Sequence, residues 1–162
     1  MQLKDAILLL QPAQLQVENR NRWADLGCGN GLFTTALAHV IDPGSIIYCI
    51  DSNQSSLKEI PDQYNEQVIE KVQADFVKDH LPFEKLDGIL MANSLHFVKD
   101  KTVFLQKLNG YLQKDYCLII VEYDTDKANK WVPYPLSFQS LSNLFMTTTK
   151  YKVTKLNEHS SI

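Results

Sequence analysis

The sequence lacks the features of several protein classes. Its 162 residues include three cysteines and no apolar run near the roughly 20 residues that cross a bilayer. Basic and acidic residues number 16 and 19, which leaves a net charge of −3. Without a basic excess, the chain has no overall field to collect nucleic acid or anionic lipid. We therefore expect no membrane partner and no non-specific nucleic-acid binding.

The cysteines and the N-terminus carry no sign of export. Cys28, Cys49 and Cys117 are odd in number and show no C-x-x-C spacing, as in reduced cytoplasmic proteins. The run Met1–Leu10 lacks both a basic segment and a small-residue cleavage site, so it predicts a helix rather than a signal peptide. We expect a cytoplasmic location and no metal centre.

One stretch, residues 23–40, organises the chain. Trp23, Ala24 and Leu26 give a short apolar strand, three glycines follow within five positions, and apolar residues then recur at helical spacing. Glycine permits positive φ and close approach of a ligand to the backbone, while the free N–H groups of the first helical turn point into the same space. A strand, a glycine turn and a helix in this order predict a small-molecule site.

The spacing of the glycines favours one ligand over another. A dinucleotide fingerprint, G-x-G-x-x-G, needs a third glycine where this chain has Leu32, which disfavours a nicotinamide-dependent oxidoreductase. The stretch from Asp25 to Gly31 instead reads acid, one residue, then G-x-G-x-G. In this it resembles the first motif of class I S-adenosylmethionine-dependent methyltransferases. The resemblance assigns Asp25, Gly27, Cys28, Gly29 and Gly31 to the methionine part of S-adenosylmethionine, although Cys28 is also simply a small residue suited to a tight turn.

Two further strands of the pattern end in acids. The apolar run Ile46–Ile50 predicts a parallel strand covered on both faces, and it ends at Asp51 and Ser52. A carboxylate at the carboxyl end of such a strand suits a ribose diol, as the family resemblance implies for Asp51, although the same acid would also suit a helix cap. A third strand, residues 68–76, ends in Asp75 and Phe76, which resemble the family's adenine site.

The fourth strand, residues 86–94, ends beside the glycine turn. Its last residues, Asn93 and Ser94, resemble the family's fourth motif, which faces the methyl donor and the acceptor. His96 follows, and an imidazole suits proton removal at neutral pH. The alternative, that His96 only packs beneath the cofactor, is favoured because a sulfonium methyl is already activated. No catalytic residue is therefore assigned.

The C-terminal part predicts a helix over 99–113, a fifth strand over 116–121, a helix over 136–146 and a sixth strand over 151–156. Between them, Tyr123, Trp131 and Tyr134 would form an aromatic wall for the acceptor, or exposed anchors for a lid. The resemblance implies a further antiparallel strand at the end of the sheet, for which no residues remain. Either the chain is a shortened member or fragment of the family, or a partner chain fills the gap, since an open sheet edge favours pairing with a second copy of the chain.

These patterns together predict an α/β fold, and the resemblance implies a Rossmann-like, doubly wound, mostly parallel sheet of order 3-2-1-4-5 with a sixth strand. We expect a single domain over 1–162, with a helical lead-in over 1–22, a cofactor core over 23–121 and an acceptor side over 122–162. The resemblance implies a methyltransferase that uses S-adenosylmethionine, with a small-molecule acceptor favoured by the absence of a basic tract. The alternative is a non-catalytic module that binds the cofactor or a protein partner.

Overall fold

Six strands form one sheet in the computed structural model, which describes residues 1–13, 21–149 and 152–158. The order is β3-β4-β2-β1-β5-β6, and every pairing is parallel except the short hairpin of β3 with β4. The predicted order of the five parallel strands is therefore confirmed. The strands span Arg22–Leu26 (β1), Ile46–Asp51 (β2), Gln63–Tyr64 (β3), Gln67–Gln73 (β4), Leu86–Ala92 (β5) and Leu112–Val121 (β6).

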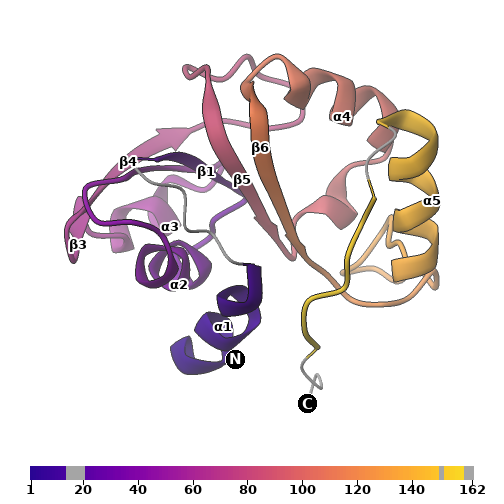
Figure 1. Cartoon of the computed structure of the whole chain (residues 1–162), viewed down its shortest axis with the longest axis horizontal. Helices are drawn as coiled ribbons and strands as arrows, with labels where there is room; N and C mark the ends of the chain where they lie inside the picture. The colour runs from indigo at the N-terminus through magenta and orange to yellow at the C-terminus, as the bar shows by residue number, and fades with distance from the viewer. Residues whose placement is uncertain (14–20, 150–151, 159–162) are drawn as a thin grey trace.

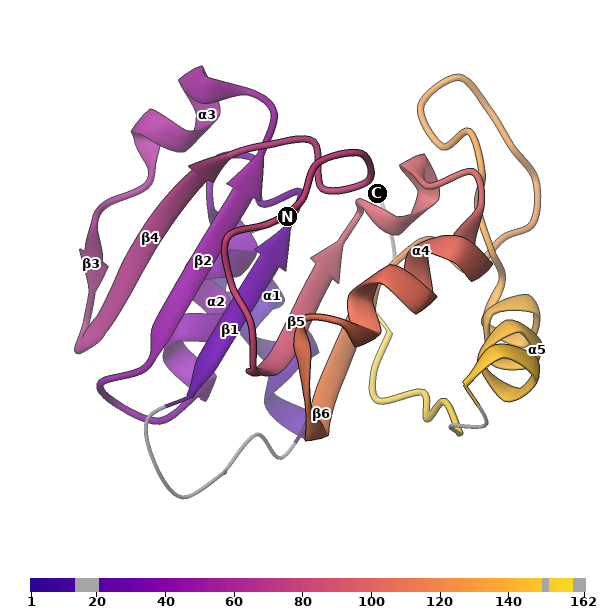
Figure 2. The same ribbon diagram turned by 90° about the horizontal axis from the view of Figure 1, so that it is seen from above.

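Helices cover both faces of this sheet (Figures 1 and 2). The helices α1, α2 and α3 pack on one face, and α4 and α5 pack on the other. Their bounds are Leu3–Leu10 (α1), Leu32–Val40 (α2), Gln54–Glu59 (α3), Lys101–Asn109 (α4) and Phe138–Thr148 (α5), with short 3₁₀ turns at Gln11–Ala13 (η1) and Leu95–Phe97 (η2). No helix in the described part of the chain has the length and apolar character to cross a membrane.

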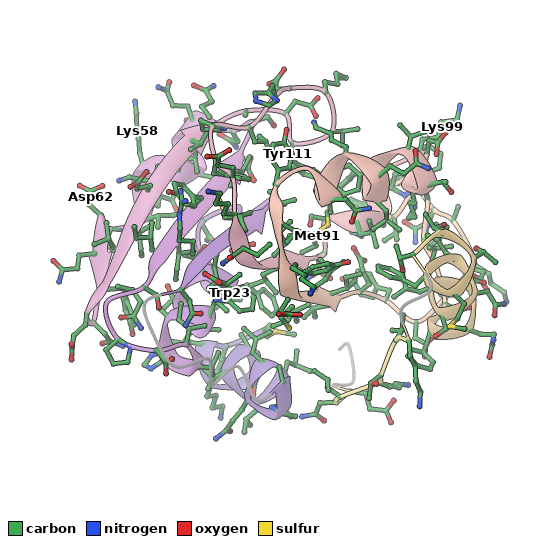
Figure 3. All side chains as sticks on the ribbon, turned by 45° about the horizontal axis from the view of Figure 1, so that its top comes forward. Trp23, Lys58, Asp62, Met91, Lys99 and Tyr111 are labelled. Carbon is green, nitrogen blue, oxygen red and sulfur yellow. The ribbon has the colours of Figure 1, made fainter. Side chains whose placement is uncertain are left out.

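The alternation of side chains along each strand builds two apolar clusters. Trp23 of β1 packs with α1 and α2, whereas its neighbour Ala24 packs with α4. Gly88 of β5 makes room for Trp23, because a Cβ at this glycine would overlap the indole ring. Trp23 and Met91 lie inside the molecule, while Lys58 and Asp62 point outward (Figure 3). Apolar layers on both faces hold the strand ends of the sheet in fixed register.

The third predicted strand is shorter than expected. It was predicted to continue to Phe76, but β4 ends at Gln73. The Asp75 carboxylate accepts the backbone N–H groups of Val77 and Lys78, which turns the chain instead of extending it.

The predicted strand over 151–156 is wrong for residues 152–156, which form no strand; residue 151 lies outside the described residues. The segment makes side-chain contacts instead of a backbone ladder. The Lys155 ammonium lies 3.3 Å from the Asp124 carboxylate, and the Asn157 amide donates to the carbonyl of Leu8. The sixth strand of the sheet is β3, and β6 lies at the other edge. The helical lead-in is present as α1, while its residues 14–20 lie outside the described residues.

Candidate functional site

The glycine turn between β1 and α2 forms the centre of the candidate site. Gly27, Gly29 and Gly31 have φ of 80°, 54° and 86°, in the left-handed region that favours glycine. The backbone N–H groups of Gly27 and Cys28 both donate to the carbonyl of Ile50, which binds the turn to β2. A Cβ at Gly29 would meet no atom within 4 Å. The middle of the turn therefore offers open space next to bare backbone, as a ligand cradle requires.

Asp51, at the end of β2, supports this turn. Its Oδ2 accepts the backbone N–H of Gly29 at 2.9 Å, and its Oδ1 accepts that of Asn53 at 2.8 Å. The predicted alternative role as helix cap belongs to Asn53, whose side chain accepts from the first turn of α3. Each carboxylate oxygen keeps a further lone pair for a hydroxyl donor. The neighbouring Ser52 is exposed beside it.

Asp25 lies beneath the turn rather than at its surface. It is 0% exposed, and its Oδ2 accepts the Thr34 hydroxyl at 2.7 Å, while no partner is found for Oδ1 among the described residues. Burial is the main cause that raises the pKa of Asp25 to about 7. The Thr34 hydrogen bond lowers this pKa by a smaller amount, and the charge of Asp51 raises it further. Thr34 was not predicted, although its place in the first turn of α2 could have indicated it.

Cys28 is also buried. Its contact with Cys49 and its burial raise the pKa of the Cys28 thiol, which keeps it protonated. This environment agrees with a small residue that fills the turn.

The ends of β4 and β5 approach the turn through Phe76 and Ser94. A Cβ at Gly27 would lie 2.6 Å from the Cβ of Ser94 and 3.3 Å from the ring of Phe76. The Ser94 hydroxyl donates to the carbonyl of Leu26 at 2.6 Å. Asn93 is exposed beside it with φ of 53°, and its backbone N–H donates to the carbonyl of Val121. The structure thus brings residues from three strand ends together.

The Asp75 carboxylate belongs to its own turn. It accepts from the backbone of Val77 and Lys78 and lies 2.9 Å from the Lys78 ammonium, and the Lys78 hydrogen bond is the main cause that lowers the pKa of Asp75. The side chain keeps 35% exposure, so it remains accessible from solvent.

His96 was considered from the sequence, but its buried partner Glu122 was not predicted. His96 is 4% exposed, and its Nδ1 lies 2.7 Å from Oε2 of Glu122, the first residue after β6. Lys101 lies close by, and its ammonium donates to the carbonyls of Val98 and Tyr134 at 2.7 and 2.6 Å. An acid directly after the fifth parallel strand was the available signal for Glu122.

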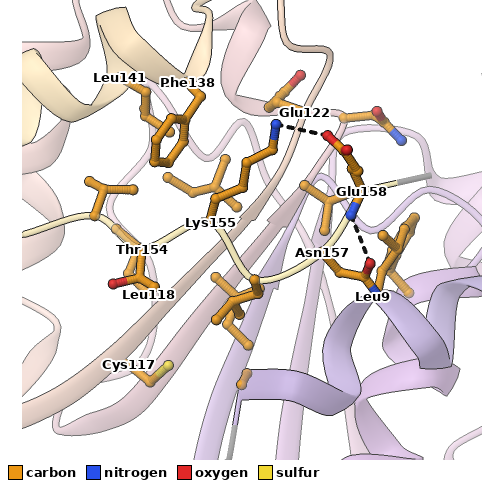
Figure 4. Close-up of a pocket in the computed structure, with 18 of the residues that line it drawn as sticks. Leu9, Cys117, Leu118, Glu122, Phe138, Leu141, Thr154, Lys155, Asn157 and Glu158 are labelled. Carbon is orange, nitrogen blue, oxygen red and sulfur yellow. Dashed lines mark hydrogen bonds and ion pairs between the residues drawn. The ribbon is translucent and has the colours of Figure 1, made fainter. Parts of the chain in front are cut away.

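A groove of about 1600 Å³ runs along the outer edge of β6 (Figure 4). Apolar side chains of β6 and α5 line it, as do Asn93, Glu122 and Tyr123 at the site end. Of the three aromatics predicted to form an acceptor wall, only Tyr123 lines this groove, and Tyr123, Trp131 and Tyr134 are 45%, 69% and 41% exposed.

The chemistry of these groups suits an adenosyl ligand. A charged tail could lie against the bare backbone at Gly29, and a diol could donate to the free lone pairs of Asp51. A flat base could lie near the ring of Phe76. They lie at the carboxyl ends of parallel strands, where open α/β sheets bind ligands.

Comparisons with known proteins agree with this geometry. A family model described as a methyltransferase domain matches residues 24–120. An uncharacterised methyltransferase of Mycobacterium tuberculosis H37Rv is 26% identical over 101 residues, which cover 62% of this chain and 50% of that protein, and a Mycobacterium bovis protein matches equally. The chain thus spans about half the length of these curated relatives.

Solved structures share the fold at low identity. An S-adenosylmethionine-dependent methyltransferase of Leishmania major has a TM-score of 0.73 at 17% identity, covering 90% of this chain and 62% of that one. Coclaurine N-methyltransferase, bound to N-methylheliamine and S-adenosylhomocysteine, has a TM-score of 0.67 at 19% identity, covering 90% and 48%. The plantazolicin methyltransferase BpumL, in complex with a pentazolic desmethylPZN analog and S-adenosylhomocysteine, has a TM-score of 0.63 at 14% identity, covering 91% and 63%.

Proposed function

This chain belongs to the methyltransferase domain family, and we propose that it transfers a methyl group from S-adenosylmethionine to a small-molecule acceptor. The single observation that carries the proposal is the pairing of the glycine turn with Asp51. The carboxylate accepts the N–H of Gly29 and so joins the ends of β1 and β2 in one cradle. Such a cradle suits one extended ligand that reaches from backbone amides to a diol carboxylate.

Each predicted site residue receives a role in this proposal. The glycine turn, residues 27–31, holds the methionine part, and the buried Asp25 holds the first turn of α2 behind it through the Thr34 hydroxyl. Asp51 and Ser52 take the ribose, while Asp75 and Phe76 take the adenine. Asn93 and Ser94 face the donor and the acceptor, because Ser94 packs directly against Gly27.

The cofactor would supply a methyl group already activated by a sulfonium centre. The residues of this chain would then contribute binding, orientation and exclusion of water. Holding two reactants in near-attack geometry is worth roughly 7 to 11 kcal/mol of the barrier. The rigid strand ends described above suit this positioning role.

A small-molecule acceptor is supported by charge and by two structural relatives. The net charge of −3 gives no general attraction for nucleic acid. Coclaurine N-methyltransferase and the plantazolicin methyltransferase were each solved with a small-molecule ligand beside S-adenosylhomocysteine.

A non-catalytic module is the second candidate, since residues 152–158 add no strand to the β6 edge of the sheet. Incubation with labelled S-adenosylmethionine and a panel of amine, phenol, thiol and carboxylate acceptors separates the two. Acceptor-dependent release of S-adenosylhomocysteine, lost in Asp51→Ala, would support the enzyme. Cofactor binding without turnover on any acceptor would favour the module.

We further propose a cytoplasmic location and self-association through β6. Free cysteines at 28, 49 and 117 support the first. The position of β6 at the edge of the sheet in the described part of the chain supports the second, because an edge strand can pair with a strand of another chain. Sedimentation velocity of the chain and of an Ile120→Lys variant tests the association, which the added charge should weaken.

A further inference from the structure

A buried histidine and a glutamate meet where β5 and β6 end. The Glu122 carboxylate makes two contacts to the same residue: Oε1 accepts the backbone N–H of His96 at 3.1 Å, and Oε2 lies 2.7 Å from Nδ1. The side chains are only 5% and 12% exposed. Since a carboxylate only accepts hydrogen bonds, Nδ1 must be the donor. The pair therefore fixes both the orientation of the imidazole and its tautomer.

The other ring nitrogen has no such partner. Among the described residues, no group hydrogen-bonds to Nε2 of His96. Nε2 is not fully enclosed either, because the polar side-chain atoms that are enclosed without a partner lie on other residues. With the proton held on Nδ1, Nε2 carries a free lone pair. A carboxylate that orients a histidine and leaves the far nitrogen free forms the arrangement of a general base.

The surroundings of the imidazole suit a flat apolar group. The ring centroid of Phe97 lies 4.3 Å from that of His96, and the ring centroid of Tyr123 lies 6.4 Å from it. Phe97 and Tyr123 are more than 40% exposed, so they offer aromatic surface to solvent. The charged neighbours are Glu122 and the buried Lys101, whose ammonium interacts electrostatically with that carboxylate. No acid other than Glu122 hydrogen-bonds to the histidine among the described residues.

The chain segment that carries His96 also reaches the glycine turn. His96 lies two residues after Ser94, which packs against Gly27. The carbonyl of His96 accepts the backbone N–H of Tyr134, which ties the loop after β6 to the same segment. The chain segment that carries His96 is therefore held between Ser94, which packs against Gly27, and the loop that follows β6.

We propose that His96 and Glu122 form the proton-accepting pair of the acceptor site, and that the acceptor bears an N–H or O–H group on a flat apolar body. This inference rests on the proposed function and names its substrate class. The heteroatom's bond to hydrogen breaks, and Nε2 of His96 takes the proton. The freed electron pair forms the new bond to the methyl carbon as the carbon–sulfur bond breaks, with its pair going to sulfur. His96 is the catalytic residue, and Glu122 is a positioning residue.

The first test needs no acceptor. Long-range ¹H–¹⁵N spectra of the full chain, with the signal assigned by its loss in His96→Gln, report which ring nitrogen carries the proton. We expect the neutral imidazole to be protonated on Nδ1 in the wild type, and to become a mixture of tautomers in Glu122→Ala. A proton on Nε2 in the wild type would overturn the proposal.

The second test compares two probes of similar shape. 2-Naphthol must lose a proton when it is methylated, whereas the ring nitrogen of isoquinoline already has a free pair. We expect His96→Gln to lower methyl transfer to 2-naphthol about 10²- to 10⁴-fold and to leave transfer to isoquinoline within about twofold. Glu122→Gln, which preserves the shape of the pair, should lower kcat for 2-naphthol with little change in KM. An equal loss on both probes, or no loss on either, would contradict the proposal.

Two controls keep this test separate from the proposed function. His39→Gln changes an exposed histidine on α2 and should leave both rates unchanged. Titration of each variant with S-adenosylhomocysteine reports the donor side alone. If the wild type does not bind S-adenosylhomocysteine, the proposed function is wrong. If it binds S-adenosylhomocysteine but carries the proton on Nε2, only the proposal for His96 and Glu122 is wrong. If neither probe is methylated, the tautomer measurement decides.

Discussion

The carboxylate of Asp51 accepts the backbone N–H of Gly29 at 2.9 Å, which joins the end of β2 to the middle of the glycine turn. The same carboxylate accepts the N–H of Asn53 through its other oxygen. Asp51 therefore shapes the cradle and presents lone pairs toward it.

Asp51→Asn should weaken S-adenosylhomocysteine binding about 10- to 100-fold, because hydrogen bonds to a charged group are worth about 1.5–3 kcal/mol. Calorimetric titration measures the change. The matched control is Asp115→Asn, which alters an exposed acid on β6 and should bind as the wild type does. Unchanged affinity in Asp51→Asn would remove Asp51 from the proposed ribose site.

Substitutions at Gly27 and Gly29 should separate folding from binding. Gly27→Ala forces a positive φ on alanine and places its methyl 2.6 Å from the Cβ of Ser94, so unfolding should become about 2–5 kcal/mol easier. Gly29→Ala also forces a positive φ on alanine, but its methyl group would meet no other atom, so the free energy of unfolding should fall by only about 1–2 kcal/mol. The methyl group would occupy the space of the ligand, so ligand affinity should fall sharply. Denaturant unfolding and calorimetry on both variants provide the comparison. Tight ligand binding by Gly29→Ala would show that the cradle lies elsewhere.

Asp25 should make the protein less stable as the pH rises from about 4 to about 7. Its pKa is raised from the ordinary value of 3.8 to about 7, so the folded chain holds a proton that the unfolded chain releases. The associated stability is complete below pH 4 and lost above pH 7, with a ceiling of about 4 kcal/mol.

The comparison with Asp25→Asn isolates this effect from other acids. The pKa of Asp75 is lowered, which gives the opposite trend in both proteins and cancels in the difference. We expect the stability of the wild type relative to Asp25→Asn to fall across pH 4–7 in urea unfolding. A constant difference would mean that Asp25 ionises normally in the folded state.

Lys101 should hold the loop after β6 against η2. Its buried ammonium donates to the carbonyls of Val98 and Tyr134, and burial lowers its pKa. Lys101→Met leaves both carbonyls without that donor, so hydrogen exchange around Tyr134 should accelerate and stability should fall by about 2–4 kcal/mol. Lys99→Met, two residues earlier and exposed, is the control and should exchange like the wild type. Equal exchange in the two variants would exclude the proposed contact.

Local patterns predicted the cofactor side of the fold well. Three glycines after a short apolar run can only form a tight turn, and apolar runs that end in acids mark the carboxyl ends of buried strands. This is why the turn and the position of Asp51 could be predicted, whereas the order of the parallel strands was implied by the resemblance to the methyltransferases. The end of α3 at Glu59 has an equally local cause, because Pro61 cannot continue a helix.

Contacts between distant residues could not be predicted. Glu122 reaches His96 across 26 positions, and the Thr34 hydroxyl meets Asp25 only after α2 has packed on β1. The period-two pattern near Val153 misled because Val153 packs against the core without a partner strand. The burial of Asp25 depends on tertiary packing. The turn at Asp75 depends on the hydrogen bonds that its carboxylate accepts from Val77 and Lys78.

Parallel calorimetric titrations with S-adenosylhomocysteine and NAD test whether the glycine turn and Asp51 bind the methyl donor. We expect micromolar binding of S-adenosylhomocysteine, at one site per chain, and no binding of NAD. Binding of NAD alone, or of neither ligand, would contradict this expectation.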